Sequence, residues 1–527
     1  MAQKTCYITT PIYYASGEVH IGNSYSTIAC DCLARYKRMA GYDTLYLTGM
    51  DEHGLKIEEA AKKNNLEPQE FVDEIASKTK NLWQELNISN DGFIRTSYDY
   101  HVKAVQKMFE QLLAQGDIYL GEYEGNYCVA CESFFTKTQL GPDEVCPDCG
   151  AKTRIVKEES YFLNLKKYEK KLLDYIEKHP DFIMPVTRKN EVVSFIKQGL
   201  EDLCVSRTSY KWGIQVPSNP KHVIYVWIDA LANYITYLGY NSDKQDNFNK
   251  YWLEGDQVIH VVGKDILRFH AIYWPIMLMA LGIPIKFKLY AHGWIMMNSG
   301  KMSKSKGNVV YPLVVKERYG LDPLRFYLAK EMPTTEDGLF TYERFIEQYN
   351  VFLANDLGNL VSRSIAMVNK YFGGKIEKGQ GKVYLADANT KLEDIINESI
   401  NKYHEYMESF QLQNAINVIF EIVGFANKYI DLTTPWALAK DEALKCELAD
   451  CLYHLCEALR CVTIMLTPFM PSSCHTIFEE LGVEEEKRGF ASLAYGAKYD
   501  YSVIEKAIVL FKRLDLQEEY KKYGISE

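Results

Sequence analysis

The segment His20-Ile21-Gly22-Asn23 stands between a turn at residues 15–18 and a helical pattern that runs from Tyr25 to Arg38. One strand pattern precedes the turn at Thr5 to Thr10, and another follows the helix at Asp43 to Thr48. This strand-helix-strand order predicts a parallel sheet whose ligand lies at the carboxyl ends of the strands. A glycine-containing turn that leads into a helix offers N–H groups and the positive end of the helix dipole. Both features suit a nucleotide phosphate.

A second motif, Lys301-Met302-Ser303-Lys304-Ser305, lies far downstream and is followed by Lys306-Gly307-Asn308. Lysines separated by small hydroxyl side chains and followed by a glycine indicate a loop that can enclose a polyphosphate. A solvated surface loop can have the same composition, so the motif gains its weight from its pairing with residues 20–23. In this order, the two motifs together resemble the HIGH and KMSKS elements of the class I aminoacyl-tRNA synthetases.

The resemblance implies that both motifs act on ATP. The implied ATP-binding residues are His20, Gly22, Asn23, Gly263, Asp265, Lys301, Ser303 and Lys304. Of these, His20, Asn23, Lys301 and Lys304 would be catalytic, with Mg²⁺ shared at the phosphates. Asn23 departs from the family pattern, which often has a second histidine at this position. Because an amide can donate a hydrogen bond but cannot carry a proton charge, we expect no general-acid role for Asn23.

The strand and helix pattern breaks near Gly121 and resumes with a strand-like apolar run at His222 to Asp229 and a strand at Gln257 to Val262. From about Glu343 it changes to long amphipathic helices. We therefore expect an α/β fold, a Rossmann-like doubly wound parallel sheet split by a zinc-bearing insertion and followed by an α-helical bundle. Together with the resemblance, this pattern implies the first half of a nucleotide-binding catalytic domain (1–116), a connective insertion with a zinc knuckle (117–221), the second half of the catalytic domain (222–290), a KMSKS loop and stem-contact region (291–345), an α-helical anticodon-binding domain (346–500) and a C-terminal helical tail (501–527).

The expected insertion contains two Cys-x2-Cys pairs, Cys128 with Cys131 and Cys146 with Cys149. Each spacing lets a tight turn direct both sulfurs toward one centre, and a set of thiolates in tetrahedral arrangement is typical of structural zinc. The alternatives are unrelated buried cysteines and a DNA-binding zinc ribbon. Acidic residues around the pairs would repel the phosphates of DNA, so the sequence favours one structural Zn²⁺.

Within the class, the resemblance is closest to the methionyl-tRNA synthetase family and extends over essentially the whole chain. It is carried by Pro11-Ile12-Tyr13-Tyr14, Tyr225 to Ala230 and Gly263-Lys264-Asp265-Ile266. The family pattern implies that a methionine side chain is enclosed by Ile12, Tyr14, Trp227, Ala230, Leu231, Tyr234, His270 and Trp274. Aromatic faces suit an uncharged, polarizable thioether, although each aromatic residue taken singly is typical of a hydrophobic core. By the same pattern, Asp51 would bind the α-ammonium group of methionine, and Asp265 would bind the ribose hydroxyls of ATP.

Two segments in the helical region resemble the family's anticodon-reading elements. They contain Asn359 and Arg363, four residues apart on one helix face, and Trp436, which follows a proline. Aromatic stacking and edge hydrogen bonds are how proteins read unstacked RNA bases. The alternative is that Trp436 is a core residue and Arg363 a surface ion-pair partner. The resemblance implies an ATP-dependent methionine–tRNA ligase that forms methionyl-adenylate and transfers methionine to the 3′-terminal adenosine of both initiator and elongator tRNA.

Composition narrows the class of protein further. Apolar residues make up 47% and charged residues 25%, as in ordinary globular proteins, and the net charge is −10. An acidic chain is not a general polyanion binder, so we expect no DNA partner. Local basic and aromatic patches must then bind the tRNA.

Residues 1–11 contain no secretory segment, and the longest apolar run, residues 271–285, is too short to span a membrane. We expect a cytoplasmic protein that, as given, is a monomer; the alternatives are another class I synthetase or a catalytically inactive tRNA-binding paralogue.

Overall fold

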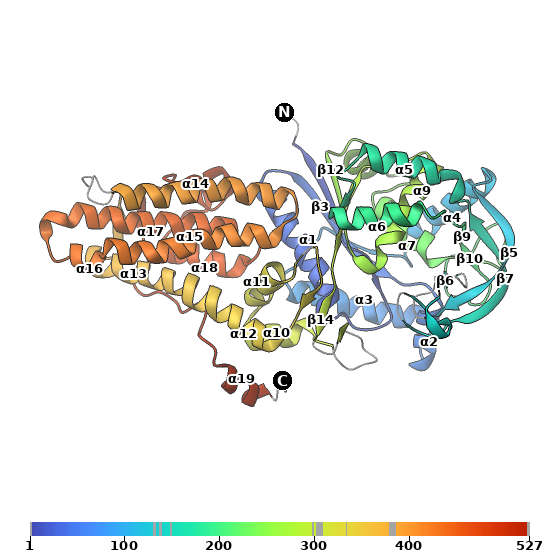
Figure 1. Cartoon of the computed structure of the whole chain (residues 1–527), viewed down its shortest axis with the longest axis horizontal. Coiled ribbons are helices and arrows are strands. Elements are labelled where there is room, and N and C mark those ends of the chain that lie inside the picture. The colour runs from blue at the N-terminus through green and yellow to red at the C-terminus, as the bar shows by residue number, and fades with distance from the viewer. Residues whose placement is uncertain are drawn as a thin grey trace. The chain divides into compact units, whose positions relative to one another are not determined.

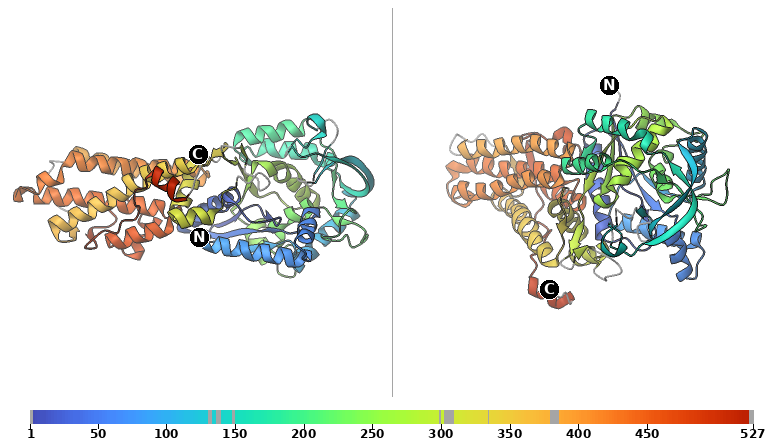
Figure 2. Two further views of the ribbon diagram at one scale, coloured as in Figure 1. Left: turned by 90° about the horizontal axis from the view of Figure 1, so that it is seen from below. Right: turned by 45° about the vertical axis from the view of Figure 1, so that its right-hand side comes forward.

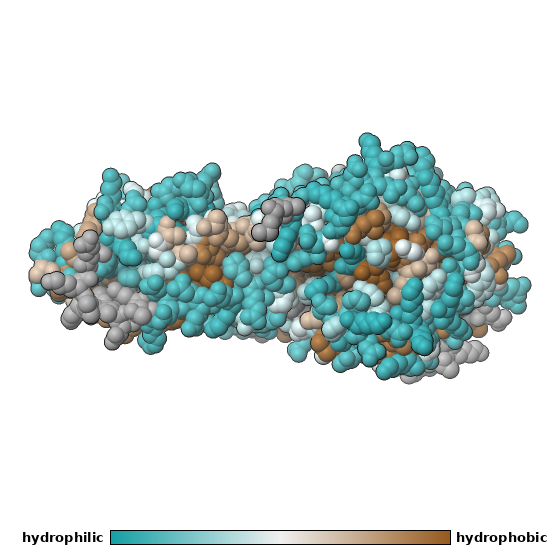
Figure 3. Space-filling view, turned by 90° about the horizontal axis from the view of Figure 1, so that it is seen from above, coloured by the Kyte–Doolittle hydropathy of each residue, from teal (hydrophilic) through white to brown (hydrophobic). Residues whose placement is uncertain are grey.

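The computed structural model describes residues 3–129, 133–135, 140–147, 150–297, 300–301, 309–333, 335–378 and 386–523. These residues form two compact units, each with its own internal packing. Unit 1 comprises Met1–Cys30 and Gly41–His292, and unit 2 comprises Asp31–Ala40 and Gly293–Glu527. No helix within the described ranges is long and apolar enough to cross a membrane. Figure 3 shows that hydrophilic residues cover most of the visible face of each unit, with smaller hydrophobic patches between them.

A seven-stranded parallel sheet forms the centre of unit 1, in the order β2-β3-β1-β12-β13-β8, with β4 beside β3. Its strands are β1 (Thr5–Thr9), β2 (Tyr13–Tyr14), β3 (Asp43–Asp51), β4 (Gly92–Arg95), β8 (Ile183–Met184), β12 (Gln257–Gly263) and β13 (Phe287–His292). All five residues of β1 are buried, as expected for a central strand that is covered on both faces. The pairing of β1 with β12 joins residues far apart in sequence, so the sheet is split as the sequence predicted.

Helices connect and cover the strands of this sheet (Figure 1). They are α1 (Ile21–Met39), α2 (Leu55–Lys63), α3 (Pro68–Glu85), α4 (Asp99–Ala114), α7 (Val226–Thr236), α8 (Asp246–Phe248), the π-helices η3 (Asn249–Leu253) and η5 (Phe269–Tyr273), the short η4 (Lys264–Ile266) and α9 (Trp274–Leu281). The strand expected at His222 to Asp229 is wrong. Only β11 (Val223–Ile224) is extended there, and helix α7 follows. Because α7 is buried almost all round, its apolar run has no polar face and cannot be told from a buried strand by periodicity.

The insertion between the halves of the sheet is built mainly on antiparallel strands in the order β6-β5-β7-β9. These are β5 (Ile118–Cys128), β6 (Ser133–Phe135), β7 (Arg154–Leu163) and β9 (Leu203–Cys204), and β10 (Ser206–Arg207) pairs with β11. The helical turns and helices of this region are η1 (Pro142–Glu144), η2 (Lys166–Tyr168), α5 (Glu169–Lys178) and α6 (Val186–Ile196).

Unit 2 begins with a small sheet and continues as a helical bundle. The sheet contains β14 (Ile295–Met297), β15 (Gly300–Lys301) and β16 (Gly338–Leu339). The helices are α10 (Pro312–Tyr319), α11 (Leu321–Glu331), α12 (Tyr342–Gln348), η7 (Tyr349–Gly358), α13 (Asn359–Phe372), α14 (Ala386–Glu408), α15 (Leu412–Thr433), α16 (Pro435–Leu438), η8 (Glu442–Leu444), α17 (Lys445–Leu466), α18 (Pro471–Leu481), η9 (Glu485–Lys487), η10 (Phe490–Ser492) and α19 (Leu516–Tyr523). In both views of Figure 2, the long helices drawn in orange lie side by side.

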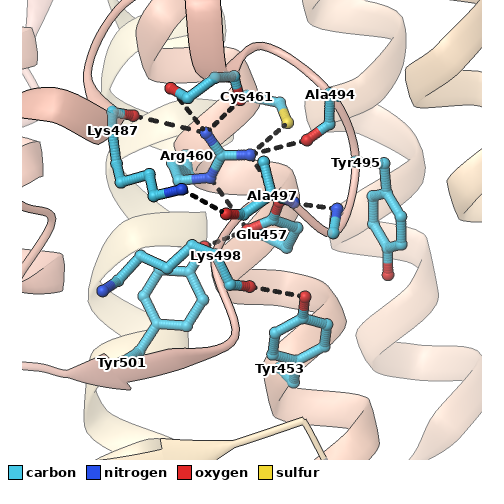
Figure 4. A network of polar contacts seen from close by, with 12 residues as sticks. Tyr453, Glu457, Arg460, Cys461, Lys487, Ala494, Tyr495, Ala497, Lys498 and Tyr501 are labelled. Atoms are coloured by element: carbon cyan, nitrogen blue, oxygen red, sulfur yellow. Dashed lines mark hydrogen bonds and ion pairs between the residues drawn. The ribbon is translucent and has the colours of Figure 1, made fainter.

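A buried ion pair fastens the segment after η9 to helix α17 (Figure 4). Arg460 donates to both carboxylate oxygens of Glu457 at 3.0 and 2.5 Å, and both side chains are fully buried. Glu457 also accepts from the backbone N–H groups of Gly496 and Ala497, and Arg460 donates to the backbone oxygen of Ala494. A buried polar group without a hydrogen-bond partner lowers the stability of the fold, and these hydrogen bonds give the carboxylate, the guanidinium and the backbone groups such partners. This part of the chain is therefore held on α17 by specific polar contacts as well as by hydrophobic packing.

Candidate functional site

The carboxyl end of strand β3 places Asp51 beside Tyr14. Strand β2 pairs in parallel with β3, with Tyr14 opposite Asp51, and the N–H of Ala15 donates to the backbone oxygen of Asp51 at 2.9 Å. Asp51 is 7% exposed, and the ammonium group of Lys56 lies 5.6 Å from the centroid of the Tyr14 ring. Two residues that the family pattern assigned to methionine are thus adjacent at a strand end, where ligands of parallel sheets bind.

The segment His20–Asn23 forms the start of helix α1. The side-chain oxygen of Asn23 accepts from the N–H of His20 at 3.3 Å, and Nδ1 of His20 accepts from the N–H of Gly22 at 3.1 Å. A Cβ atom on Gly22 would lie 3.0 Å from Cε1 of His20, so a larger residue would crowd the imidazole. The oxygen of the Asn23 amide accepts from the backbone, and the NH₂ group, which is the donor of this side chain, is the part that could bind an anion.

Strand β12 ends at Gly263, and Asp265, which is exposed, follows in the turn η4. A Cβ atom on Gly263 would lie 2.4 Å from Oδ1 of Asp265. Glycine is therefore required for the carboxylate of Asp265 to lie this close to the strand end. A carboxylate at this position can accept hydrogen bonds from ribose hydroxyls, which is the role expected for it.

Six of the residues expected to enclose a methionine side chain lie on helices α7, η5 and α9, and the other two, Ile12 and Tyr14, lie on or just before β2. The hydroxyl of Tyr234 lies 2.7 Å from Nε2 of His270, and Nδ1 of His270 lies 2.9 Å from the backbone oxygen of Ile266. A carbonyl can only accept, so Nδ1 carries the proton and Nε2 accepts from the Tyr234 hydroxyl. Burial lowers the pKa of His270 to about 4 and raises that of Tyr234. Both side chains are therefore uncharged at neutral pH.

Two further members of this set lie near the Tyr234–His270 pair. The Trp274 ring lies 6.0 Å from that of Tyr234, and the Trp227 ring lies 6.4 Å from that of His270. Ala230 and Leu231 are buried on α7. Ile12, Tyr14, Trp227, Leu231, Tyr234 and Trp274 all belong to or pack against one hydrophobic cluster. The structure thus brings Trp227 and Tyr234 of α7 close to His270 and Trp274, whereas Ile12 and Tyr14 share only the larger hydrophobic cluster with them.

Two further residues contact this set without having been expected there, and a third, Thr9, contacts one of those two. Phe269 stacks on Trp227 with 3.6 Å between ring centroids and an angle of 12° between planes. His260 stacks on Tyr234 at 4.1 Å, and its Nδ1 is hydrogen-bonded to Thr9 at 2.7 Å. Phe269 directly precedes His270 in sequence, which is the only local signal for it. His260 and Thr9 lie on strands β12 and β1, and nothing in the sequence of these strands predicts that either residue lies near the expected methionine residues.

The cysteine pairs are only partly described. Cys128 and Cys146 are buried together in a small cluster with Leu140 and Ala151 packed against it. The N–H of Cys146 donates to Ala151, and Gly150, at a positive φ of 73°, donates to the backbone oxygen of Cys146. This tight turn is the kind of geometry that directs sulfurs to one centre. Cys131 and Cys149 lie outside the described ranges, and the described side chains contain no group of three or more potential metal ligands.

The lysine motif lies at the edge of the described residues in unit 2. The backbone of Lys301 pairs with Met296 across β14 and β15, and residues 302–308, including Ser303 and Lys304, fall outside the described ranges. The expected contribution of this motif to ATP binding stays a prediction.

The expected anticodon residues lie on the helical bundle of unit 2. Asn359 begins α13 and is exposed. Arg363, one turn later, lies 3.5 Å from Asp431 near the end of α15. Trp436 follows this helix end and is 45% exposed. Such exposure of a large indole argues against the alternative that Trp436 is a core residue. Arg363, by contrast, does form an ion pair of the kind that the alternative expected for it.

The split parallel sheet, the motif at the start of α1 and the appended helical bundle define a class I tRNA synthetase. Residues 6–365 match the family described as "tRNA synthetases class I (M)", and residues 390–514 match "Anticodon-binding domain of tRNA ligase". The chain is 52% identical to the methionine–tRNA ligase of Lactococcus lactis over 98% of this chain and 78% of that one. It is 50% identical to the methionine–tRNA ligase of Caldanaerobacter subterraneus over 98% of this chain and 80% of that one. The chain belongs to the methionine–tRNA ligase family.

Solved structures agree with this assignment. A crystal structure of Mycobacterium tuberculosis methionyl-tRNA synthetase bound by methionyl-adenylate has a TM-score of 0.91 and 37% identity, and the match covers 97% of this chain and 100% of that one. The free state of the same M. tuberculosis enzyme has a TM-score of 0.85 and 34% identity, and covers 98% of this chain and 99% of that one. The α/β fold with a helical C-terminal region is therefore confirmed.

Proposed function

We propose that this chain joins methionine to tRNA in two steps, with the residues of unit 1 binding methionine and the nucleoside part of ATP. In the first step, the methionine carboxylate attacks the α-phosphate of ATP and pyrophosphate leaves. In the second, a terminal ribose hydroxyl of the tRNA displaces AMP. Neither step needs a nucleophilic side chain, so the protein acts by positioning the reactants and stabilising charge.

The observation that carries the choice of amino acid is the uncharged Tyr234–His270 pair within an aromatic cluster. With its proton on Nδ1 and Nε2 occupied by Tyr234, the imidazole of His270 offers no charge to a ligand. Such apolar, uncharged surroundings suit a polarizable thioether better than a charged or strongly polar side chain. Asp51, beside Tyr14 at the strand end, would pair with the α-ammonium group.

ATP would lie along the strand ends of the same sheet. The N-terminus of α1, with His20, Gly22 and Asn23, would donate to the phosphates, and Asp265 would accept from the ribose hydroxyls. We propose that Lys301, Ser303 and Lys304 complete the phosphate site, with Mg²⁺ neutralising charge there. The four cysteines at 128, 131, 146 and 149 would hold one structural Zn²⁺, for which the buried Cys128–Cys146 cluster is the present support.

Unit 2 would recognise the tRNA. Exposed Trp436 supports stacking on an anticodon base, with Asn359 and Arg363 hydrogen-bonding base edges. We propose that the enzyme acts as a monomer in the cytoplasm on both initiator and elongator tRNA.

The decisive experiment is amino-acid-dependent exchange of labelled pyrophosphate into ATP, measured with each of the twenty standard amino acids. Methionine should give the highest rate by far. Preference for another amino acid would indicate a different class I synthetase, and exchange with none would indicate an inactive paralogue.

A further inference from the structure

Helix α7 contains a buried carboxylate that contacts two histidines from different elements. Oδ2 of Asp229 accepts from Nδ1 of His53 at 2.6 Å, and Oδ1 accepts from Nε2 of His101 at 2.7 Å. Asp229 is completely buried. Burial by itself raises the pKa of this carboxyl, but the two imidazoles outweigh it and the net pKa lies below the usual range. The carboxylate is therefore ionised and uses both oxygens.

The two histidines differ in what they connect. His101 lies on α4, and its second nitrogen, Nδ1, is 2.7 Å from the hydroxyl of Thr236, so both of its hydrogen bonds go to α7. His53 lies directly after strand β3, two residues beyond Asp51. One oxygen of Asp229 thus joins two helices, and the other joins the end of β3 to α7.

Other contacts anchor the residues around His53 to different elements. Arg95 on β4 donates to the Glu52 carboxylate at 2.6 Å. The indole of Trp212 donates to the backbone oxygen of Glu52 at 2.5 Å, and the N–H of Gly54 donates to the backbone oxygen of Trp212 at 3.1 Å. The link from His53 to Asp229 adds α7 to these anchors, and α7 carries Trp227, Ala230, Leu231 and Tyr234.

We propose that Asp229 is a positioning residue for methionine, which acts through His53 to hold Asp51 at a fixed place relative to the residues of α7 that would contact the methionine side chain. The inference rests on the proposed function. An amino acid presents its ammonium group and its side chain from a single carbon atom, so both subsites must keep their spacing for both to be filled. The ATP residues expected on α1 and β12 do not depend on this link.

The test compares matched leucine variants of the two histidines by steady-state pyrophosphate exchange. His53→Leu should raise the KM for methionine about tenfold, the scale expected for losing a hydrogen bond to a charged group, while the KM for ATP changes less than about twofold. His101→Leu removes an equivalent bond from the same carboxylate. It should lower the melting temperature but leave the KM for methionine within about twofold of wild type.

Two further variants separate positioning from stability. His53→Asn keeps an N–H donor at the place of Nδ1 and should restore most of the methionine affinity. In the double variant Asp229→Leu with His53→Leu, both partners are apolar, which should recover stability relative to Asp229→Leu alone. The KM of the double variant for methionine should nevertheless stay above that of wild type. It should not exceed the higher of the two KM values measured for Asp229→Leu alone and His53→Leu alone.

Three results would overturn the proposal. They are equal effects of His53→Leu and His101→Leu on the KM for methionine, an equal rise in the KM for ATP, or multiplying effects of Asp229→Leu and His53→Leu. A wild-type protein without methionine-dependent exchange would instead overturn the proposed function.

Discussion

Acidification should destabilise unit 1 through His270. The pKa of this imidazole is about 4 in the folded protein, because of burial, against 6.5 for an unperturbed histidine. The unfolded chain therefore binds more protons between these two values, so the stabilising contribution is complete above pH 6.5 and is lost as the pH falls toward 4. Between pH 7 and pH 5, His270 alone should lower the free energy of unfolding by about 2 kcal/mol.

The measurement is urea unfolding at pH 7 and pH 5, followed by tryptophan fluorescence, for wild type and His270→Gln. Glutamine does not titrate, so the variant should lose about 2 kcal/mol less than wild type between the two pH values. Burial also lowers the pKa of His454, which is present in both proteins, so its effect cancels. The pKa of His260 is lowered mainly by burial and further by the charge on His270, so relief of that charge in His270→Gln adds to the difference in the same direction. His454→Gln, a matched substitution in unit 2, tests whether the tryptophan signal reports on unit 1. The same pH dependence in wild type and His270→Gln would refute a neutral, buried His270.

Three other predictions concern the remaining sites. Lys304→Ala should slow adenylate formation by about two to three orders of magnitude with little change in methionine affinity, measured by single-turnover kinetics; an unaltered rate would remove Lys304 from the site. Metal analysis of protein purified without chelators should find about one zinc per chain, lost in the double variant Cys146→Ser with Cys149→Ser; zinc retained by that variant would contradict the site. Trp436→Ala should weaken tRNA recognition by about 1–3 kcal/mol in aminoacylation kcat/KM while pyrophosphate exchange stays near wild type; equal losses in both assays would make Trp436 a structural residue.

The sequence predicted those parts of the fold in which the order of elements along the chain and the hydrophobic periodicity of each element indicate the same structure. The first strand, helix and second strand follow the predicted order, although α1 begins earlier, at Ile21, and β3 continues to Asp51. These extensions matter because they place Ile21 to Asn23 in the first turn of α1 and Asp51 at the end of β3. Helix α7 was missed because a helix buried on all sides lacks the polar face on which helical periodicity depends.

The residues expected to bind methionine follow from family resemblance and stay a prediction, whereas the contacts that the structure shows around them had no signal in the sequence. His53, His101 and Asp229 belong to three elements that are distant along the chain, and a hydrogen bond between them depends on tertiary packing. Their residue types are equally compatible with solvated surface positions. Phe269 and His260 are similar cases, since an aromatic residue in a buried helix or strand is most often part of the core.

Helix α1 has a consequence for how this protein can be divided. Its first residues belong to unit 1, whereas residues 31–40 belong to unit 2, where Asp31 pairs with the fully buried Arg325 at 2.6 Å. A fragment that starts at Gly293 would leave the Arg325 guanidinium buried without this carboxylate, a loss that typically costs about 3–5 kcal/mol. No single cut can therefore release both units intact. A two-piece version of this enzyme would have to keep α1 whole, and an isolated helical half would need residues 31–40 supplied as a separate peptide.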